Sequence, residues 1–463
     1  MMSHKLLKVK TLKHALIAAV CVTAFFCHGA QGTRAFAGQS TDNATDLTGV
    51  WNTFDSCFPD TPYTMTIEQQ ANTVTLMSTA GPDLSCSGTL SGPNLTLNCT
   101  GSGANGEACV MIGTVDNASS LELSPQDNAT HTCTLTKHTG LDSMVEKMLM
   151  MVNFSEAIKP LGERTPGQMR RYMARSNSMS FLFPAAPVAS IKNIYIPGPG
   201  GRIPVRVYTP NGAGPFPVVV FYHGGGWVVG KVRQFDHFCR LLATKASALV
   251  LSVDYRLAPE HVFPAAHDDA YAALDWAAGN AGQLGGDPAR LAVMGESAGG
   301  NMATVVSRMA REQGGPDVRF QVLLCPVTNV SYMSTGSYSQ FATGYMLTKE
   351  WMEAFRGYYL PETSDWTDTR VSPLLSQSLA GLPPALVITA EYDVLRDDGE
   401  AYARRLSEAG VQVKHYRCGG VIHGFTTALV DYLVQAQQAV SLIARDLNRA
   451  LGDSGSVATR GYP

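Results

Sequence analysis

The chain has 463 residues, of which 45% are hydrophobic and 16% are charged, against roughly 25% charged residues in an ordinary soluble domain. This length exceeds one typical domain and is enough for a large core. The formal net charge is -3 and Lys and Arg do not cluster beyond the first residues, which argues against nucleic-acid binding. The sequence has no apolar run of about 18 residues, so we expect no membrane-spanning helix.

The first 37 residues have the pattern of an export signal. Four lysines between Lys5 and Lys13 precede an apolar stretch at residues 15–26, and residues 35–37 (Ala-Phe-Ala) fit a small-x-small cleavage site. We therefore expect residues 1–37 to be a signal peptide and the mature protein to be exported, either periplasmic or secreted. Residues 453–463, at the other end, are expected to form a flexible tail.

Residues 38–138 differ from the rest of the chain in charge and in pattern. Residues 39–138 hold ten acidic residues and one basic residue. Apolar residues such as Met65 and Ile67 alternate with polar ones, and a period of two is typical of β-strands. Gly-Val-Trp at 49–51 is similar to the opening of lipocalin-like barrels. These features predict a small acidic all-β domain, lipocalin-like or barrel-like.

The cysteines of this segment predict disulfides, because an exported chain meets oxidising conditions and no metal-binding spacing is present. A turn cluster at residues 91–94 separates Cys86 from Cys99. If Leu90 pairs with Leu95 across this turn, Cys86 lies opposite Cys99. Opposite Cβ atoms are about 4.5–5.5 Å apart, within reach of a disulfide after modest twisting. We therefore predict a Cys86–Cys99 disulfide. The five cysteines are Cys57, Cys86, Cys99, Cys109 and Cys133.

From residue 141 the sequence alternates between helical and β-rich segments. Residues 141–180 carry helical periodicity with many methionines, and Pro204 directly precedes the second predicted strand. Near-continuous apolar runs predict strands buried on both faces. Their alternation with helices predicts a mostly parallel sheet covered on both sides, so the fold class is α/β. The predicted strands are 191–196, 205–208, 218–222, 248–253, 291–294, 320–324, 385–389 and 411–416, and the predicted helices are 236–246, 265–280, 298–312 and 398–409.

The segment Gly-Glu-Ser-Ala-Gly at 295–299 points to a serine nucleophile. It follows the strand predicted at 291–294 and precedes a predicted helix, which is the context of a nucleophile elbow. Its glycines allow a very tight turn. The turn raises Ser297 over the sheet edge at a helix N-terminus, where developing negative charge is favoured. The alternative is a glycine-rich helix start in which Ser297 only caps the helix.

A serine hydroxyl needs a base to take its proton and a carboxylate to orient that base. In the fold expected here, the acid and the histidine follow the serine, each just after a later strand. Asp393 follows the strand at 385–389, and His423 follows the strand at 411–416. The weaker candidates are Glu391 as a second choice of acid, His415 inside a predicted strand, and Asp397 and Asp398 as expected caps of the next helix.

A second glycine-rich segment, His-Gly-Gly-Gly-Trp at 223–227, follows the strand at 218–222. Acyl transfer passes through an oxyanion, and backbone N–H groups of such a loop can stabilise it. A phosphate-binding loop is the competing interpretation, but its Lys-Ser/Thr ending is missing. We expect His223 to fix the loop conformation rather than to titrate in catalysis.

Residues 141–450 resemble the hormone-sensitive-lipase-like family, bacterial family IV, of α/β-hydrolases. The motifs are those at 223–227 and 295–300, Asp-Tyr-Arg-Leu-Ala-Pro-Glu at 254–260, Glu-Tyr-Asp-Val-Leu-Arg-Asp at 391–397 and Ile-His-Gly-Phe at 422–425. Two departures from the family are Glu296 in place of the commoner Asp and Val394 in place of the usual Pro.

The resemblance implies roles for particular residues. A helical cap would consist of about residues 141–185 and 331–370. The implied triad is Ser297, Asp393 and His423, and the implied oxyanion hole consists of the N–H groups of Gly225, Gly226 and Ala298.

The sequence thus predicts an exported serine carboxylesterase with its hydrolase domain at 139–452. Its substrate would be a small-molecule ester of short-to-medium chain length, and no metal or cofactor is implied. Cap methionines and residues 181–183 are expected to form an apolar wall of the substrate site. The alternatives are an amidase or peptidase on the same fold, or a binding protein whose β-domain holds a polymer or a cell surface. The pattern does not indicate an oligomeric state.

Overall fold

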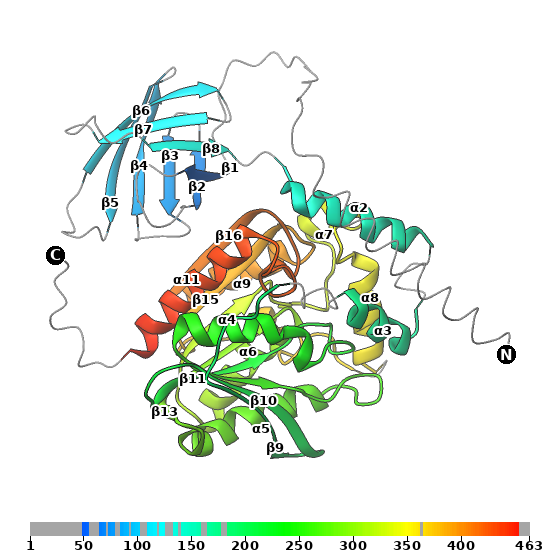
Figure 1. Ribbon diagram of the computed structural model, residues 1–463. Helices are drawn as coiled ribbons and strands as arrows, with labels where there is room; N and C mark the ends of the chain where they lie inside the picture. Colours follow the sequence, from blue (N-terminus) through cyan, green and yellow to red (C-terminus); the bar gives the residue numbers. More distant parts are fainter. Residues whose placement is uncertain are drawn as a thin grey trace. The chain divides into compact units, whose positions relative to one another are not determined.

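The computed structural model describes residues 140–158, 164–176, 183–361 and 364–452 and, between residues 49 and 137, eight strands (Figure 1). The predicted signal peptide at 1–37 and the predicted tail at 453–463 lie outside these residues. Within the described part, no helix is long and apolar enough to cross a membrane.

The first eight strands form a closed antiparallel sheet. Each strand pairs with the next along the chain, and β1 also pairs with β8. The strands are β1 (Gly49–Phe54), β2 (Thr64–Gln70), β3 (Thr73–Ser78), β4 (Leu84–Ser91), β5 (Asn94–Gly101), β6 (Cys109–Asn117), β7 (Ser120–Pro125) and β8 (Cys133–Lys137).

The pairing of β4 with β5 confirms the predicted register. Leu90 lies opposite Leu95, and Cys86 lies opposite Cys99. Both strands run one residue further than expected, so the turn between them holds two residues instead of four. On its other side, Cys99 lies opposite Cys109 of β6. The side chains of these cysteines lie outside the described part of the chain, so the Cys86–Cys99 disulfide stays a prediction.

The strands after residue 190 form the predicted α/β sheet. Its order is β16-β15-β14-β13-β11-β12-β10-β9. Neighbours from β12 to β16 are parallel, whereas β9 and β10 are antiparallel at one edge. The strands are β9 (Ser190–Gly198), β10 (Gly201–Thr209), β11 (Phe216–Tyr222), β12 (Leu249–Val253), β13 (Gly286–Glu296), β14 (Val318–Leu324), β15 (Ala385–Tyr392) and β16 (Val413–Ile422).

The start of β10 corrects one prediction. Because β10 begins at Gly201, Pro204 lies inside the strand, opposite Tyr195, rather than before it. The Pro204 carbonyl accepts a hydrogen bond from the Asp254 N–H (2.9 Å), one residue beyond the end of β12. Because proline has no N–H, Pro204 lacks only the hydrogen bond that it would donate back at this end of the ladder. The missing N–H is tolerated there.

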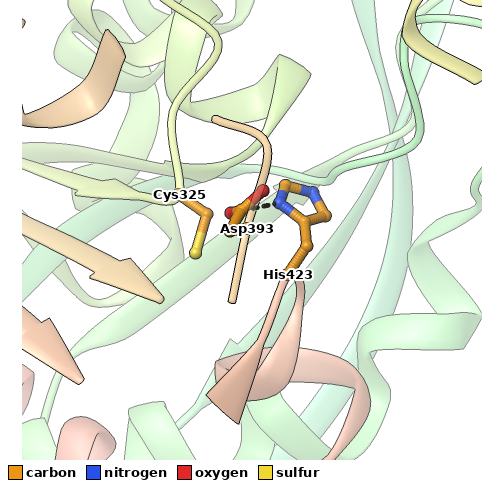
Figure 2. Close-up of side chains that lie close together, drawn as sticks. All are labelled: Cys325, Asp393 and His423. Atoms are coloured by element: carbon orange, nitrogen blue, oxygen red, sulfur yellow. Dashed lines mark hydrogen bonds and ion pairs between the residues drawn. The ribbon is translucent and has the colours of Figure 1, made fainter. Parts of the chain in front are cut away.

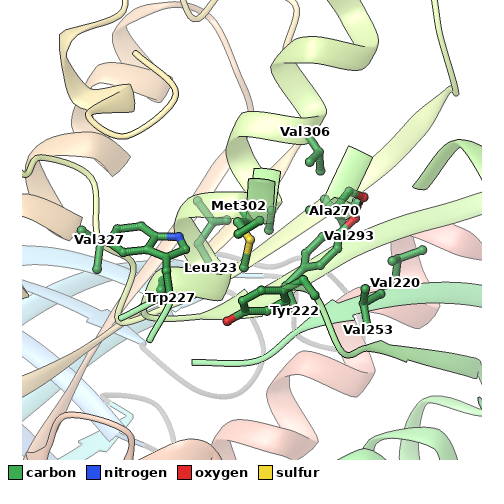
Figure 3. Close-up of a cluster of buried hydrophobic side chains, with 14 of the residues drawn as sticks. Val220, Tyr222, Trp227, Val253, Ala270, Val293, Met302, Val306, Leu323 and Val327 are labelled. Atoms are coloured by element: carbon green, nitrogen blue, oxygen red, sulfur yellow. Dashed lines mark hydrogen bonds between the residues drawn. The ribbon is translucent and has the colours of Figure 1, made fainter. Parts of the chain in front are cut away.

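Helices cover both faces of this sheet, and side chains alternate between two cores because successive strand residues point to opposite faces. Val220 and Tyr222 of β11 pack with helices α5 and α6 (Figure 3), whereas Val219 and Phe221 lie in the core shared with α4 and α11. The helices are α2 (Ser143–Ile158), α3 (Pro166–Ser176), α4 (Asp236–Ala246), α5 (Ala265–Asn280), α6 (Ala298–Gln313), α7 (Gly336–Gln340), α8 (Lys349–Tyr359), α9 (Arg396–Glu408), α10 (Phe425–Ala428) and α11 (Val434–Leu451).

The N-terminus of α9 corrects a second prediction. The helix begins at Arg396 without a side-chain cap, so Asp397 and Asp398 lie in its first turn and do not cap it. Asp397 instead accepts a hydrogen bond from the backbone N–H of Ser337 in α7 (2.7 Å). Asp398 is buried, and burial raises its pKa to about 8. Contacts with distant segments, which sequence spacing does not reveal, determine the environment of both side chains.

Candidate active site

Ser297 lies in the turn between β13 and α6. Its backbone is in a conformation that is rare for a residue with a side chain, with φ +57° and ψ -119°. The Ser297 side chain makes no capping hydrogen bond, so the interpretation of a merely capping serine is wrong. The turn is tight because α6 approaches β11 closely: a Cβ atom on Gly299 would lie 2.0 Å from the Tyr222 carbonyl oxygen. The serine is therefore presented by a strained elbow.

Asp393 and His423 directly follow β15 and β16, at the same end of two neighbouring parallel strands. The Nδ1 atom of His423 lies 2.7 Å from Oδ2 of Asp393 (Figure 2). The other Asp393 oxygen accepts a hydrogen bond from the Leu395 N–H (3.0 Å). Asp393 and His423 are both buried. This bond fixes the orientation of the imidazole and leaves its Nε2 atom as the nitrogen that can accept or donate a proton in the pocket.

The environment of His423 favours its protonated form. Burial disfavours the imidazolium, but the negative charge and hydrogen bond of Asp393 oppose this, and the charge of Glu296 adds to them. Together they raise the pKa of His423 above its ordinary value. Such tuning by a buried carboxylate is typical of catalytic histidines.

One pocket brings Ser297 and His423 together with Gly225 and Gly226. It encloses about 740 Å³ of empty volume, part of it open to solvent. Asp393 lies behind His423, and Ala298 is the buried residue after Ser297. The remaining wall is mostly apolar and includes Met173, Val229, Met346, Leu347, Trp351, Met352 and Phe355.

The glycine-rich loop is held by contacts that a side chain would disrupt. The Gly225 carbonyl accepts hydrogen bonds from the N–H groups of Val228 (3.0 Å) and Val229 (2.9 Å). Gly226 has φ +57°, and a Cβ atom there would lie 2.3 Å from the Phe355 ring. This conformation favours glycine, and it lets the backbone line the pocket.

His223, at the start of this loop, has structural contacts. Its Nδ1 atom lies 2.8 Å from the Gly224 carbonyl oxygen, and its ring stacks on Tyr255 with centroids 4.3 Å apart. The side chain is fully buried, and burial lowers its pKa. A neutral, buried imidazole fits the expected role of fixing the loop.

The weaker catalytic candidates have other partners. Glu391 accepts a hydrogen bond from the Gly420 N–H of β16 (2.8 Å). His415 contacts the hydroxyl of Thr389 through Nε2 (3.0 Å). Neither side chain is among those that line the Ser297 pocket. The geometry therefore favours Asp393 over Glu391 as the carboxylate that orients His423.

From the sequence, no role was assigned to two polar residues of the pocket, Glu296 and Thr427. Glu296 is buried next to Ser297, and its Oε1 accepts a hydrogen bond from the Thr427 hydroxyl (2.6 Å). Burial raises the pKa of Glu296. Glu296 stands out in the sequence as a departure from the family motif. Its partner lies four residues after His423, however, and only the fold brings the two together.

Cys325 is a further neighbour of the Asp393–His423 pair. A ligand atom of each of the three residues lies within 4.8 Å of the others (Figure 2), a donor set that could suit zinc. Burial, with the charges of Asp393 and Glu296, raises the pKa of the Cys325 thiol well above its usual range. A metal ligand would be a thiolate, and here Asp393 is already bonded to His423. The cluster fits an Asp–His pair beside a neutral thiol better than a metal site.

A chain of hydrogen bonds connects helix α8 of the pocket wall to the turn of Ser297. The hydroxyl of Tyr359, at the end of α8, lies 2.8 Å from Nδ1 of His267 in α5. The other ring nitrogen of His267 lies 2.8 Å from Oδ1 of Asn301 in α6. The Asn301 N–H in turn donates to the Ser297 carbonyl (3.0 Å). Helix α8 is therefore tied to the turn that presents Ser297.

The predicted methionine wall is only partly correct. Met173 lines the pocket, but Met144 and Met148 pack against the core on the α4 and α11 side. The Phe183 ring contacts Tyr432, with centroids 4.8 Å apart, while residues 181 and 182 lie outside the described residues. Most of the wall comes from residues 346–355, which lie in the second segment of the predicted cap and include Met346 and Met352.

Comparison with known proteins identifies the family. A family model described as an alpha/beta hydrolase fold matches residues 219–427. Carboxylesterase NlhH of Mycobacterium tuberculosis is 45% identical over 255 residues, which cover 54% of this chain and 79% of NlhH. The chain belongs to the hormone-sensitive-lipase-like family of α/β-hydrolases.

Further relatives and solved structures agree with this assignment to the hormone-sensitive-lipase-like family. Carboxylic ester hydrolase LipN of the same bacterium is 47% identical over 241 residues, covering 51% of this chain and 64% of LipN. The solved structure of an ester-hydrolase from the metagenome of Lake Arreo is 40% identical, with a TM-score of 0.64, and the match covers 67% of this chain and 98% of that one. A hyperthermophilic esterase from Pyrobaculum calidifontis gives the same identity and TM-score and is covered to 99%. The resemblance inferred from the motifs is confirmed.

Proposed function

We propose that the protein is a serine carboxylesterase in which Ser297 is the nucleophile, His423 the base and Asp393 the acid that orients it. The observation that carries the proposal is the 2.7 Å bond between His423 and Asp393, beside the pocket that holds Ser297 on its elbow. This arrangement has the parts of a Ser-His-Asp site. The names of the relatives support an ester as the substrate.

The residues suggest the following reaction. The Ser297 hydroxyl oxygen attacks the ester carbonyl carbon while Nε2 of His423 takes the hydroxyl proton. N–H groups of Gly225, Gly226 and Ala298 stabilise the oxyanion. His423 then returns the proton to the leaving alcohol, which leaves an acyl group on Ser297. Water, deprotonated by His423, attacks this acyl-enzyme, releases the carboxylic acid and restores the serine.

The pocket supports substrates of short-to-medium acyl length. Its apolar wall, with Met346, Met352 and Trp351, suits an aliphatic chain, and methionine adapts to different shapes. Acyl groups of about four to eight carbons should react faster than emulsified long-chain triglyceride. Nothing in the comparisons favours the amidase, peptidase or polymer-binding alternatives.

We further propose that the enzyme is exported and has two domains after a signal peptide at 1–37. Residues 38–138 would be a lipocalin-like all-β domain with disulfides, which holds a polymer or a surface. Residues 139–452 would be the hydrolase, with a cap at about 141–185 and 331–370. The charge contrast, the closed sheet and the cysteines support this division. N-terminal sequencing of the protein from its native host tests the cleavage.

Replacement of the nucleophile tests the activity. Ser297→Ala should lower kcat by about 10⁴- to 10⁶-fold, because removing one member of a triad removes the contribution of the whole triad. A fluorophosphonate probe should label the wild type at Ser297 alone. Near-normal hydrolysis by the variant, or labelling of another serine, would contradict the assignment.

A further inference from the structure

A second cavity adjoins the Ser297 pocket. It has about 800 Å³ of empty volume and is lined by α3 and by residues 230–234, which lead into α4. Gly230 and Gln234 line both cavities, so the second cavity continues from the first. We call it the cationic groove, defined by Arg170, Ala174, Gly230, Lys231, Arg233 and Gln234.

One of its three cations is part of the framework. Arg170 donates to the backbone carbonyls of Val228 and Ala258 (2.8 Å each) and to both carboxylate oxygens of Glu260 (2.8 and 2.6 Å). The hydrogen bond from Arg170 lowers the pKa of Glu260 to about 2, so Glu260 stays ionised at neutral pH. The charges of Arg170 and Glu260 therefore offset each other, and Arg170 fixes the wall of the groove.

The other two cations have no such compensation. Lys231 and Arg233 are exposed, and among the described residues no carboxylate oxygen lies within 4.0 Å of either side chain. The groove thus carries a net positive charge next to an apolar pocket. A concave site lined by one sign of charge attracts ligands of the opposite sign.

We propose that the cationic groove is a subsite for an anionic group on the ester substrate, recognised by Lys231 and Arg233. This inference rests on the proposed function, because it assigns the groove to the substrate of Ser297. The apolar pocket would hold the part of the substrate near the ester bond, and a carboxylate, sulfonate or phosphate further along would lie in the groove. The preferred substrates are then amphipathic esters, such as half-esters of dicarboxylic acids.

Paired substrates with the same carbon chain or ring, one anionic and one neutral, test this inference. Monomethyl adipate against methyl hexanoate places the anion on the acyl part, and 4-acetoxybenzoate against 4-acetoxybenzamide places it on the alcohol part. The full-length enzyme should show a higher kcat/KM for the anionic member of at least one pair. In the double variant Lys231→Gln/Arg233→Gln, the anionic-to-neutral ratio of kcat/KM should fall by about three- to tenfold. Raising the salt concentration should lower the wild-type ratio.

A matched control uses cations outside the groove. Lys192→Gln/Arg202→Gln removes two exposed charges from β9 and β10 and should leave the ratio unchanged. The inference would be overturned if the wild type had the same kcat/KM for the anionic and the neutral member of both pairs. It would also be overturned if the control variant showed the same fall in the ratio. A groove variant that loses binding to anionic phospholipid vesicles but keeps its ratio would overturn it too, since the groove would then serve a lipid surface. Failure to hydrolyse the neutral esters would instead contradict the proposed function.

Discussion

Replacing Glu296 by glutamine should move the pH dependence of catalysis to lower pH. In the proposed mechanism His423 must be neutral to accept the serine proton, so activity should fall as the pH drops through its pKa. That pKa is raised by Asp393 and, to a smaller extent, by Glu296, which places the acidic limb of the wild-type profile above the ordinary histidine value of 6.5. Glu296→Gln removes one of these charges and keeps a side chain that can accept the Thr427 hydrogen bond.

The size of the shift follows from the position of the carboxylate. Oε1 of Glu296 lies 3.7 Å from where a Cβ atom on Gly424, the residue after His423, would be. A unit charge about 6–8 Å from an ionisable group, at an effective dielectric constant of roughly 20–40, is worth about 1–3 kcal/mol, or about one to two pKa units. Because burial raises the pKa of Glu296 itself, these figures are upper bounds for the effect of its charge on His423. The acidic limb of Glu296→Gln should therefore lie at lower pH than that of the wild type, by at most about one to two units.

The assay is kcat/KM for a neutral ester between about pH 5 and 9. Thr427→Val is the matched control, because it removes the 2.6 Å hydrogen bond but keeps the carboxylate. Its acidic limb should stay close to that of the wild type. An unchanged limb in Glu296→Gln, or a shift to higher pH, would refute the idea that Glu296 acts on His423 through its charge.

Three further predictions concern the loop, the core and the β-sheet. Gly226→Ala should lower kcat by roughly 10²- to 10³-fold, as expected for a disturbed oxyanion hole, because its Cβ would clash with Phe355. Gly279→Ala is the control, since nothing lies within 4 Å of its Cβ. Equal kcat values for the two variants would contradict a role of Gly226 in the oxyanion hole. Asn301→Ala should lower the free energy of unfolding by about 3–4 kcal/mol, because three buried hydrogen bonds are lost. A loss below about 1 kcal/mol in chemical denaturation would contradict this prediction. Non-reducing peptide mapping should join Cys86 to Cys99; a Cys99–Cys109 peptide would show that the other neighbour is preferred.

The central sheet and the elbow of Ser297 could be predicted because local signals agree there. Runs such as 218–222 are apolar throughout because both faces of the strand are buried. The glycines around Ser297 report a turn that only glycine allows, and Asp393 and His423 directly follow strands, so order along the chain was enough to place them.

Features that depend on contacts between distant segments could not be predicted. The partner of Glu296 is Thr427, and the neighbour of the Asp393–His423 pair is Cys325. Neither pairing has a characteristic spacing. Asp397 failed as a helix cap because a backbone N–H of α7, 60 residues earlier, takes its carboxylate. Met144 and Met148 pack against the core instead of the pocket for the same reason.

The position of α8 limits how this enzyme can change its substrate range. Met352 of α8 lines the pocket and packs in the core. Phe355 also packs against Gly226, and Tyr359 leads through His267 to the turn of Ser297. Substitutions at Met352 can reshape the pocket with little effect on turnover. Substitutions at Phe355 would change both the shape of the pocket and the turnover rate. Adaptation to new esters would therefore proceed through one turn of the helix, while the neighbouring turn stays under selection for catalysis.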